Sequence, residues 1–371
     1  MKRLGWILAL LIVAAPAWSA NKKITVQQLK DLLISWQQAK KADALVADYL
    51  KDVRLTEQMT SGVRISLVQY APGPSSIEQI KILEGLSAFL PPPASDLPST
   101  PAPDAATQNA ILAKAQNYVT SIYMQNPHLT ATKQSFRYQD DEGNMSTTPG
   151  IYDNAPNIAI RQLEINSDTI DSDQGVEKTP NKKERTQRTG LISDGGPGPS
   201  LGVVLQEATA AGKLAWLRWE TVDGRPAAVF SFAVEKKKSR VEVNLCCFPH
   251  SDTETDIAAP GEVPIPGNEW RPFRKSIGYH GEIFIDPEKG NVLRLIFRAD
   301  LKPTDFVHQD DIRTDYGTVI AASRNYFLPI DSFILTEVVP NGDISVARYF
   351  ARHALFKATY QNYQPAGTPQ K

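Results

Sequence analysis

The stretch that decides the fold is GYHGEIFIDPEKGNVLRLIFRAD, residues 278–300. Its two halves alternate side chains from one residue to the next, which is typical of β-strands. Between them lies DPEKGN at 286–291, a run of residues that favour turns. Strands joined by so short a turn run antiparallel, so the stretch predicts a β-hairpin.

The same alternation recurs along most of the chain after His128. Turn sequences at 222–226 (VDGRP) and 235–239 (EKKKS) separate neighbouring runs, and one helical segment at 201–212 (LGVVLQEATAAG) interrupts them. The pattern predicts an α+β protein whose C-terminal two-thirds form a large, curved, half-barrel-like antiparallel sheet with one or two covering helices. The predicted strands are 131–140, 213–222, 226–235, 239–248, 276–286, 291–300 and 346–360.

The N-terminal part shows helical spacing instead. In VQQLKDLLISWQQA (26–39) apolar residues recur every three or four positions. SSIEQIKILEGLSAFL (75–90) repeats this spacing, with Ser75 or Ser76 as the predicted N-cap. Segment 21–90 is therefore predicted to be a unit of three or four helices. The predicted buried face within 75–90 consists of Ile77, Ile80, Leu83 and Leu86.

A proline-rich segment at 91–103, PPPASDLPSTPAP, follows this unit. Its six prolines in thirteen positions fix the backbone and remove N–H donors, so we expect an extended connector. The next segment, DAATQNAILAKAQNYVTSIYMQ, predicts a helix with Asp104 as its N-cap. The predicted organisation is a helical unit at 21–90, the connector, and a domain of helix and sheet at 104–371.

Residues 1–20, MKRLGWILALLIVAAPAWSA, have the layout of a secretory signal peptide. A basic start at Lys2 and Arg3 precedes a short apolar run and then small residues. We therefore expect an exported protein, in the periplasm or outside the cell. Cleavage would remove two positive charges and no negative one, so the formal net charge would go from −1 to −3. This charge argues against nucleic acid as a partner, and no later segment is apolar enough to predict a membrane span.

Both cysteines stand together in VEVNLCCFPHSD, residues 241–252. Strand alternation predicts that Cys247 points into the core and Cys246 away from it. We expect two ordinary strand residues. Because an exported chain meets oxidising conditions and neither cysteine has another partner, a strained vicinal disulfide is the alternative. Pro249 and His250 follow at a spacing that matches no zinc pattern, so no metal is predicted.

The sequence GPSLG at 198–202 fits the catalytic pattern G-x-S-x-G. In hydrolases of that pattern the serine sits on a sharp turn between a strand and a helix. A short strand, TGLIS at 189–193, is plausible here, but Pro199 directly precedes Ser200 and DGGPGP makes the approach a loop. We expect Ser200 to cap the following helix. The alternatives are a serine hydrolase that uses Ser200 and an anion held by backbone N–H groups of this loop.

The sequence YHGEIF places His280 and Glu282 on one face of a strand. They could form an acid–base pair or offer two metal ligands. Ile283 and Ile285 occupy the opposite, apolar face, so we expect the face with His280 and Glu282 to be solvated. The sequence predicts no cofactor.

Five stretches share a pattern with known sequences: LTEQMT (55–60), LSAFLPPPASDLP (86–98), AAVFSFAVEKKKSRVEVNLCCFP (227–249), GYHGEIFIDPEKGNVLRLIFRADLKPTD (278–305) and DIRTDYG (311–317). Together they resemble a group of exported acidobacterial proteins without an assigned activity, a resemblance that implies no catalytic residue. The hairpin GEIFIDPEKGNVLRL is also similar to strands in the half-barrel of the bacterial outer-membrane lipoprotein carriers. That similarity implies a curved sheet around an apolar pocket for acyl chains, and it concerns the fold alone.

These observations predict a non-enzymatic protein of the cell envelope that binds an apolar or amphipathic ligand, with a lipid as one candidate, between the sheet and its helix. A serine hydrolase is the first alternative. The second is an interaction module, in which the helical unit and the connector dock a protein partner and the sheet is a scaffold.

Overall fold

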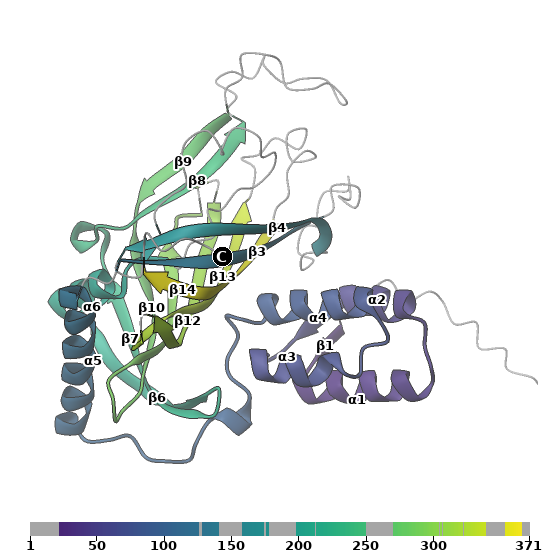
Figure 1. Cartoon of the computed structure of the whole chain (residues 1–371), viewed down its shortest axis with the longest axis horizontal. Helices are drawn as coiled ribbons and strands as arrows, with labels where there is room; N and C mark the ends of the chain where they lie inside the picture. Colours follow the sequence, from purple (N-terminus) through teal and green to yellow (C-terminus); the bar gives the residue numbers. More distant parts are fainter. Residues whose placement is uncertain are drawn as a thin grey trace, which may run out of the picture.

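The chain folds as an α+β protein, as the sequence predicts (Figure 1). A helical N-terminal unit packs on one face of a large, curved antiparallel sheet, and two more helices cover the other face. The predicted signal peptide lies outside the described residues. The structure is a computed structural model that describes residues 22–125, 128–140, 158–173, 176–177, 198–211, 213–249, 270–303, 305, 307–321, 323–338 and 353–365.

The helical unit contains four helices, in agreement with the predicted three or four. A pair of three-residue parallel strands joins its start to its middle; strands this short carry no readable alternation and were not predicted. Apolar residues of all four helices and of the second strand form its core. Its elements are β1 (Lys22–Ile24), α1 (Val26–Gln38), α2 (Asp43–Lys51), β2 (Val53–Leu55), α3 (Ser61–Val68) and α4 (Pro74–Leu86).

The sequence predicts Ser75 or Ser76 as the N-cap of α4, and this prediction is wrong. The helix begins at Pro74, so Ser75 and Ser76 lie inside its first turn. Their backbone N–H groups donate to the two carboxylate oxygens of Asp43, at 2.9 Å each. A carboxylate at this end satisfies orphan donors and interacts favourably with the helix dipole. The cap comes from α2, which the local sequence of α4 cannot reveal.

The large sheet has ten strands, all paired antiparallel, in the order β5-β4-β3-β14-β13-β12-β11-β10-β7-β6. Within the described residues its end strands β5 and β6 do not pair with each other, so the sheet is open. The strands are β3 (His128–Asp140), β4 (Ile158–Asp173), β5 (Val176–Glu177), β6 (Leu214–Val222), β7 (Arg225–Val234), β10 (Gly278–Ile285), β11 (Val292–Asp300), β12 (Val307–Ala321), β13 (Arg324–Val338) and β14 (His353–Pro365).

The hairpin predicted at 278–300 is confirmed as β10 and β11. Two backbone hydrogen bonds of 2.8 Å close its turn, from Asp286 N–H to Asn291 O and from Gly290 N–H to Asp286 O. Gly290 takes the positive φ of 77° that such a turn requires. The strand predicted at 239–248 exists but lies elsewhere. As β8 (Glu242–Pro249) it pairs with β9 (Trp270–Ser276) in a separate sheet of two strands.

Strand alternation gives the sheet two different faces. On β11, Leu293, Leu295 and Phe297 pack in one core with α5 (Ala105–Gln125) and α6 (Leu201–Ala211). The residues between them point to the opposite face, toward the helical unit. The Asp104 cap of α5 is confirmed, because its carboxylate accepts the Thr107 N–H at 2.7 Å.

Helix α4 is buried on two sides, whereas the sequence predicts one apolar face. Ile80 and Leu83 pack inside the helical unit. Ile82 and Leu86 pack on the sheet against Tyr138 and other apolar residues of β3, β13 and β14. Apolar contacts of α4 with the sheet therefore help to fix the position of the helical unit, in addition to the covalent link through the connector.

The connector runs from the helical unit past β6 to the start of α5 (Figure 1). It is extended except for a short 3₁₀ turn at Ala94–Asp96. Pro91 O accepts the Gln58 N–H at 2.8 Å, and Pro101 O accepts from Trp219 Nε1 at 2.9 Å. In the part of the chain that the structure describes, no helix combines the length and hydropathy needed to cross a bilayer.

Candidate functional site

A pocket of about 840 Å³ lies between helices α5 and α6, and none of its described lining residues belongs to a strand of the sheet. Its described lining contains both apolar and polar side chains, which suits an amphipathic molecule better than a purely apolar one. Gln116 and Thr209 join the two helices at this wall through a hydrogen bond of 3.0 Å. The described lining consists of Gln116, Val119, Thr120, Ser200, Gly202, Val203, Leu205, Gln206, Thr209, Ala210 and Arg240.

Arg240 is the one charged residue in the described lining of this pocket. Its Nε donates to Glu207 Oε1 at 2.8 Å and its Nη2 to Gln206 Oε1 at 2.7 Å. Glu207 is buried, and its other carboxylate oxygen accepts from Tyr279 Oη at 2.8 Å. Burial and this bond to a carboxylate raise the pKa of the Tyr279 phenol. Arg240 is thereby fixed at the mouth while its Nη1 group has no partner among the described residues.

Ser200 lines the same pocket and directly precedes α6. Its carbonyl accepts the Val204 N–H at 3.0 Å, which is the backbone bond of an N-cap residue. No histidine or carboxylate belongs to the described lining around Ser200. Residues 189–197, which include the strand predicted at 189–193, lie outside the described residues, so the hydrolase alternative stays a prediction.

Cys246 and Cys247 belong to strand β8. They fall at a break in its register, because Leu245 pairs with Phe273 and Phe248 already pairs with Arg271. A bulge of this kind interrupts strict alternation, so the predicted inward and outward orientations do not follow from sequence position alone. The two side chains, and His250, lie outside the described residues, and the vicinal disulfide stays a prediction.

His280 and Glu282 share a face of β10, as the sequence predicts, but they have different partners. His280 is half-exposed, and its Nδ1 lies 2.7 Å from Asp300 Oδ1. Glu282 accepts from Arg218 Nη2 at 2.8 Å and is largely covered. The expectation of a solvated face therefore holds at His280 and fails at Glu282, because the connector crosses above that end of the strand. No cluster of three or more His, Cys, Asp or Glu side chains suited to a metal occurs within the described segments.

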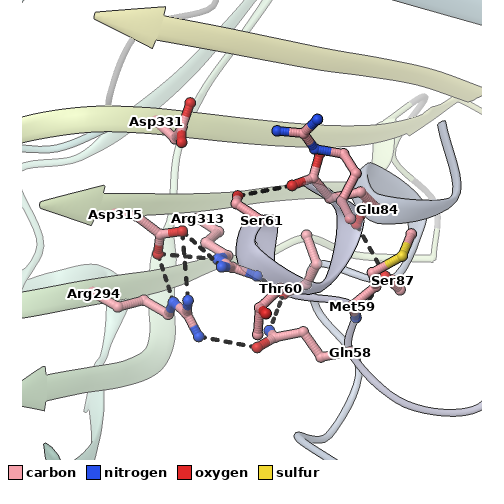
Figure 2. Close-up of polar contacts among 12 residues, drawn as sticks. Gln58, Met59, Thr60, Ser61, Glu84, Ser87, Arg294, Arg313, Asp315 and Asp331 are labelled. Carbon is pink, nitrogen blue, oxygen red and sulfur yellow. Dashed lines mark hydrogen bonds and ion pairs between the residues drawn. The ribbon is translucent and has the colours of Figure 1, made fainter. Parts of the chain in front are cut away.

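A network of buried charges, which the sequence did not indicate, lies under the helical unit (Figure 2). Asp315 of β12 accepts from Arg294 Nε at 2.5 Å and from Arg313 Nη2 at 2.6 Å, and all three side chains are buried. Burial alone would raise the pKa of Asp315. The two guanidinium groups outweigh that effect and hold the pKa well below its usual range.

Residues of the helical unit also take part in this network. Arg294 Nη1 donates to Gln58 Oε1 at 3.0 Å, and Gln58 Nε2 donates to Ala88 O at 2.8 Å. Glu84 of α4 forms a second centre, accepting from Lys357 Nζ at 2.7 Å and from Ser61 Oγ at 2.8 Å. These bonds fix the position of α4 on the sheet, whereas apolar contacts alone would leave it free to slide.

Two further buried acids have raised pKa values. Burial, with the neighbouring charge of Asp311, raises the pKa of Asp310 to about 7, although Thr336 donates a hydrogen bond to it. Burial likewise raises the pKa of Asp331 to about 6, against the effect of Lys357. Figure 2 shows Asp331 apart from the dashed network around Asp315. Both carboxylates are therefore costly to ionise in the folded chain.

This gives a prediction for the pH dependence of stability. Between about pH 4 and pH 7 the folded chain holds protons on Asp310 that the unfolded chain releases, so this residue's contribution to stability falls as pH rises. We expect the free energy of unfolding of Asp310→Asn, measured relative to that of the wild type, to increase when the pH is raised from 5 to 8. Urea unfolding of both proteins at the two pH values measures the difference. The exposed Asp31→Asn is the control, and a pH-independent difference for Asp310→Asn would contradict the prediction.

Comparison with known proteins finds no matching family model, no similar curated protein and no similar solved structure. The resemblances to the exported acidobacterial proteins and to the lipoprotein carriers therefore stay predictions from the sequence.

Proposed function

We propose that the chain is a non-enzymatic binding protein of the cell envelope and that the pocket beside α5 and α6 holds an amphipathic ligand. The observation that carries this proposal is the pocket itself. Its volume of about 840 Å³ falls within the range of roughly 300–1,000 Å³ that is usual for small-molecule sites. Helices α5 and α6 rest on the main hydrophobic core, so the wall is supported by rigid elements.

Arg240 favours an anionic head group. It is the charged residue of the described lining, and hydrogen bonds to Glu207 and Gln206 hold it in place. A carboxylate or phosphate could accept from its remaining N–H groups, while Val119, Val203 and Leu205 offer apolar surface to a chain. A fatty acid or an anionic lipid has this combination. Export through the predicted signal peptide would bring the chain to a compartment bounded by lipid.

Filling the pocket should weaken ligand binding without affecting the fold. Ala210 lines the pocket and is exposed, so Ala210→Trp should weaken binding of the fluorescent fatty acid cis-parinaric acid at least about tenfold, which is 1.4 kcal/mol. Ala113→Trp, at an exposed position of α5 outside the pocket, is the matched control. Fluorescence titration measures both. Equal affinity in the two variants would place the binding elsewhere.

The charge at the mouth has its own test in the same titration. We expect Arg240→Gln to weaken cis-parinaric acid about two- to fivefold, since Arg240 is 62% exposed and exposed ion pairs contribute at most about 1 kcal/mol. The uncharged methyl ester should lose nothing. A loss of the same size for acid and ester would contradict the role of the arginine as the partner of an anion.

A further inference from the structure

A second cavity, separate from the proposed ligand pocket, lies where the connector crosses the sheet. It measures about 290 Å³, and its wall combines residues 89–92 and Leu97 with side chains of β6, β10 and β11. The Phe89, Phe284 and Ile296 side chains make part of this wall apolar. The volume is at the lower end of the range for ligand sites, so an occupant must be small.

Most of the charges around this cavity already have partners. Arg218 Nη2 donates to Glu220 Oε2 at 2.6 Å and to Glu282 Oε2 at 2.8 Å, so this guanidinium bridges two carboxylates. Glu220 is fully buried beneath it and also lies 4.0 Å from Arg294. These groups form the closed floor of the site.

One cation and one anion on the same wall do not meet. Glu282 pairs with Ile296 across β10 and β11, and Arg298 lies two residues further on, which makes the two side chains diagonal neighbours within reach of each other. Among the described contacts they nevertheless form no ion pair. Oε1 of Glu282 has no partner there. Arg298 makes only a hydrogen bond of 3.3 Å to Phe89 O and a loose approach of 3.9 Å to Asp311.

We infer that this cavity binds a small zwitterion with an apolar side chain, such as an apolar α-amino acid. Its carboxylate would accept from Arg298 and its ammonium would donate to Glu282. Its side chain would lie against Phe89, Phe284 and Ile296. A zwitterion is favoured because two groups of opposite charge line this small space with bonding capacity left over. Arg218 occupies only Oε2 of Glu282, and the ion pair of Arg298 with Asp311 is long at 3.9 Å, so a ligand with a single charge would engage only one of the two.

The test is isothermal titration calorimetry of the full chain with L-leucine and L-phenylalanine. Two analogues of leucine lack one charge each: 4-methylpentanoate has no ammonium group and 3-methylbutylamine has no carboxylate. We expect heat of binding from at least one amino acid, and binding of both analogues at least about tenfold weaker, as the loss of one charged hydrogen bond requires. No heat from either amino acid at millimolar concentration, or analogues that bind equally well, would overturn the inference.

Variants separate this site from non-specific binding. Arg298→Gln and Glu282→Gln should each weaken the amino acid at least about tenfold. The exposed Arg274→Gln on β9 and Glu288→Gln in the hairpin turn are matched controls that should bind as the wild type does. If Arg298→Gln fails to fold, Glu282→Gln decides, because Arg218 keeps Glu220 as its partner in that variant. Wild-type affinity in Glu282→Gln would overturn the assignment.

Discussion

Replacing Asp315 with asparagine is expected to lower the free energy of unfolding by about 3–5 kcal/mol. Asp315 is the shared partner of Arg294 and Arg313, and both arginines are at most 2% exposed. Asparagine keeps the shape of the side chain but removes the negative charge, so two buried guanidinium groups would lose the carboxylate that they share. Burial without a partner is the costly state of a charge, whereas the intact network contributes little net stability.

Urea unfolding followed by far-UV circular dichroism measures this loss. Asp48→Asn is the matched control, because Asp48 forms a surface pair with Lys51 and is 80% exposed. It should change stability by less than about 1 kcal/mol. A loss of that small size for Asp315→Asn would mean that water reaches the two arginines and that the helical unit does not seal them against the sheet.

Replacing Gly281 with alanine should be at least as damaging, with an expected loss of about 4 kcal/mol or more. A Cβ at Gly281 would lie 1.9 Å from the backbone oxygen of Ile296 on the neighbouring strand. That oxygen belongs to the main chain, so no change of rotamer relieves the clash and β10 must move away from β11. The β10–β11 hairpin, which lies inside the sheet between β12 and β7, would lose its register.

Gly62→Ala on α3 is the control for this change, since a Cβ there would meet nothing within 4 Å. An alanine in a helix should be neutral or stabilising by up to about 1 kcal/mol. The two variants therefore make the same substitution with opposite expected signs. If Gly281→Ala had the same urea midpoint of unfolding as the wild type, β10 and β11 would have to lie further apart at Gly281 than the structure has them.

Local sequence signals predicted the parts of the fold whose determinants are local. The hairpin at 278–300 and the helix at 201–212 follow from alternation, turn residues and helical spacing within single stretches. The Asp104 cap also depends on neighbours three residues away. None of these features depends on a residue far away in the sequence, and the structure confirms each of them.

Strand β12 could not be predicted in the same way. Its sequence VHQDDIRTDYGTVIA places Asp311, Arg313 and Asp315 at buried positions, so the charges conceal the alternation. Their burial is possible only because Arg294 and Gln58 supply partners from elsewhere in the chain. Polar residues in such a strand look like a loop until those partners are known.

The candidate pocket shows the same limit. The sequence singled out Ser200, which does line the pocket, but gave no reason to choose Arg240. Arg240 acquires its role through Glu207, which is 33 residues away. Arg298 and Glu282 in the second cavity become neighbours only through the register of β10 and β11, and the connector that encloses them comes from a distant segment.

The most direct test of the proposed function is native mass spectrometry of the mature chain purified from a periplasm, alongside Ala210→Trp and Ala113→Trp. The proposal predicts a bound anionic amphiphile on the wild type and on Ala113→Trp, lost when either protein is denatured, and none on Ala210→Trp. A wild-type chain that is empty as purified and still empty after incubation with a long-chain fatty acid would contradict it.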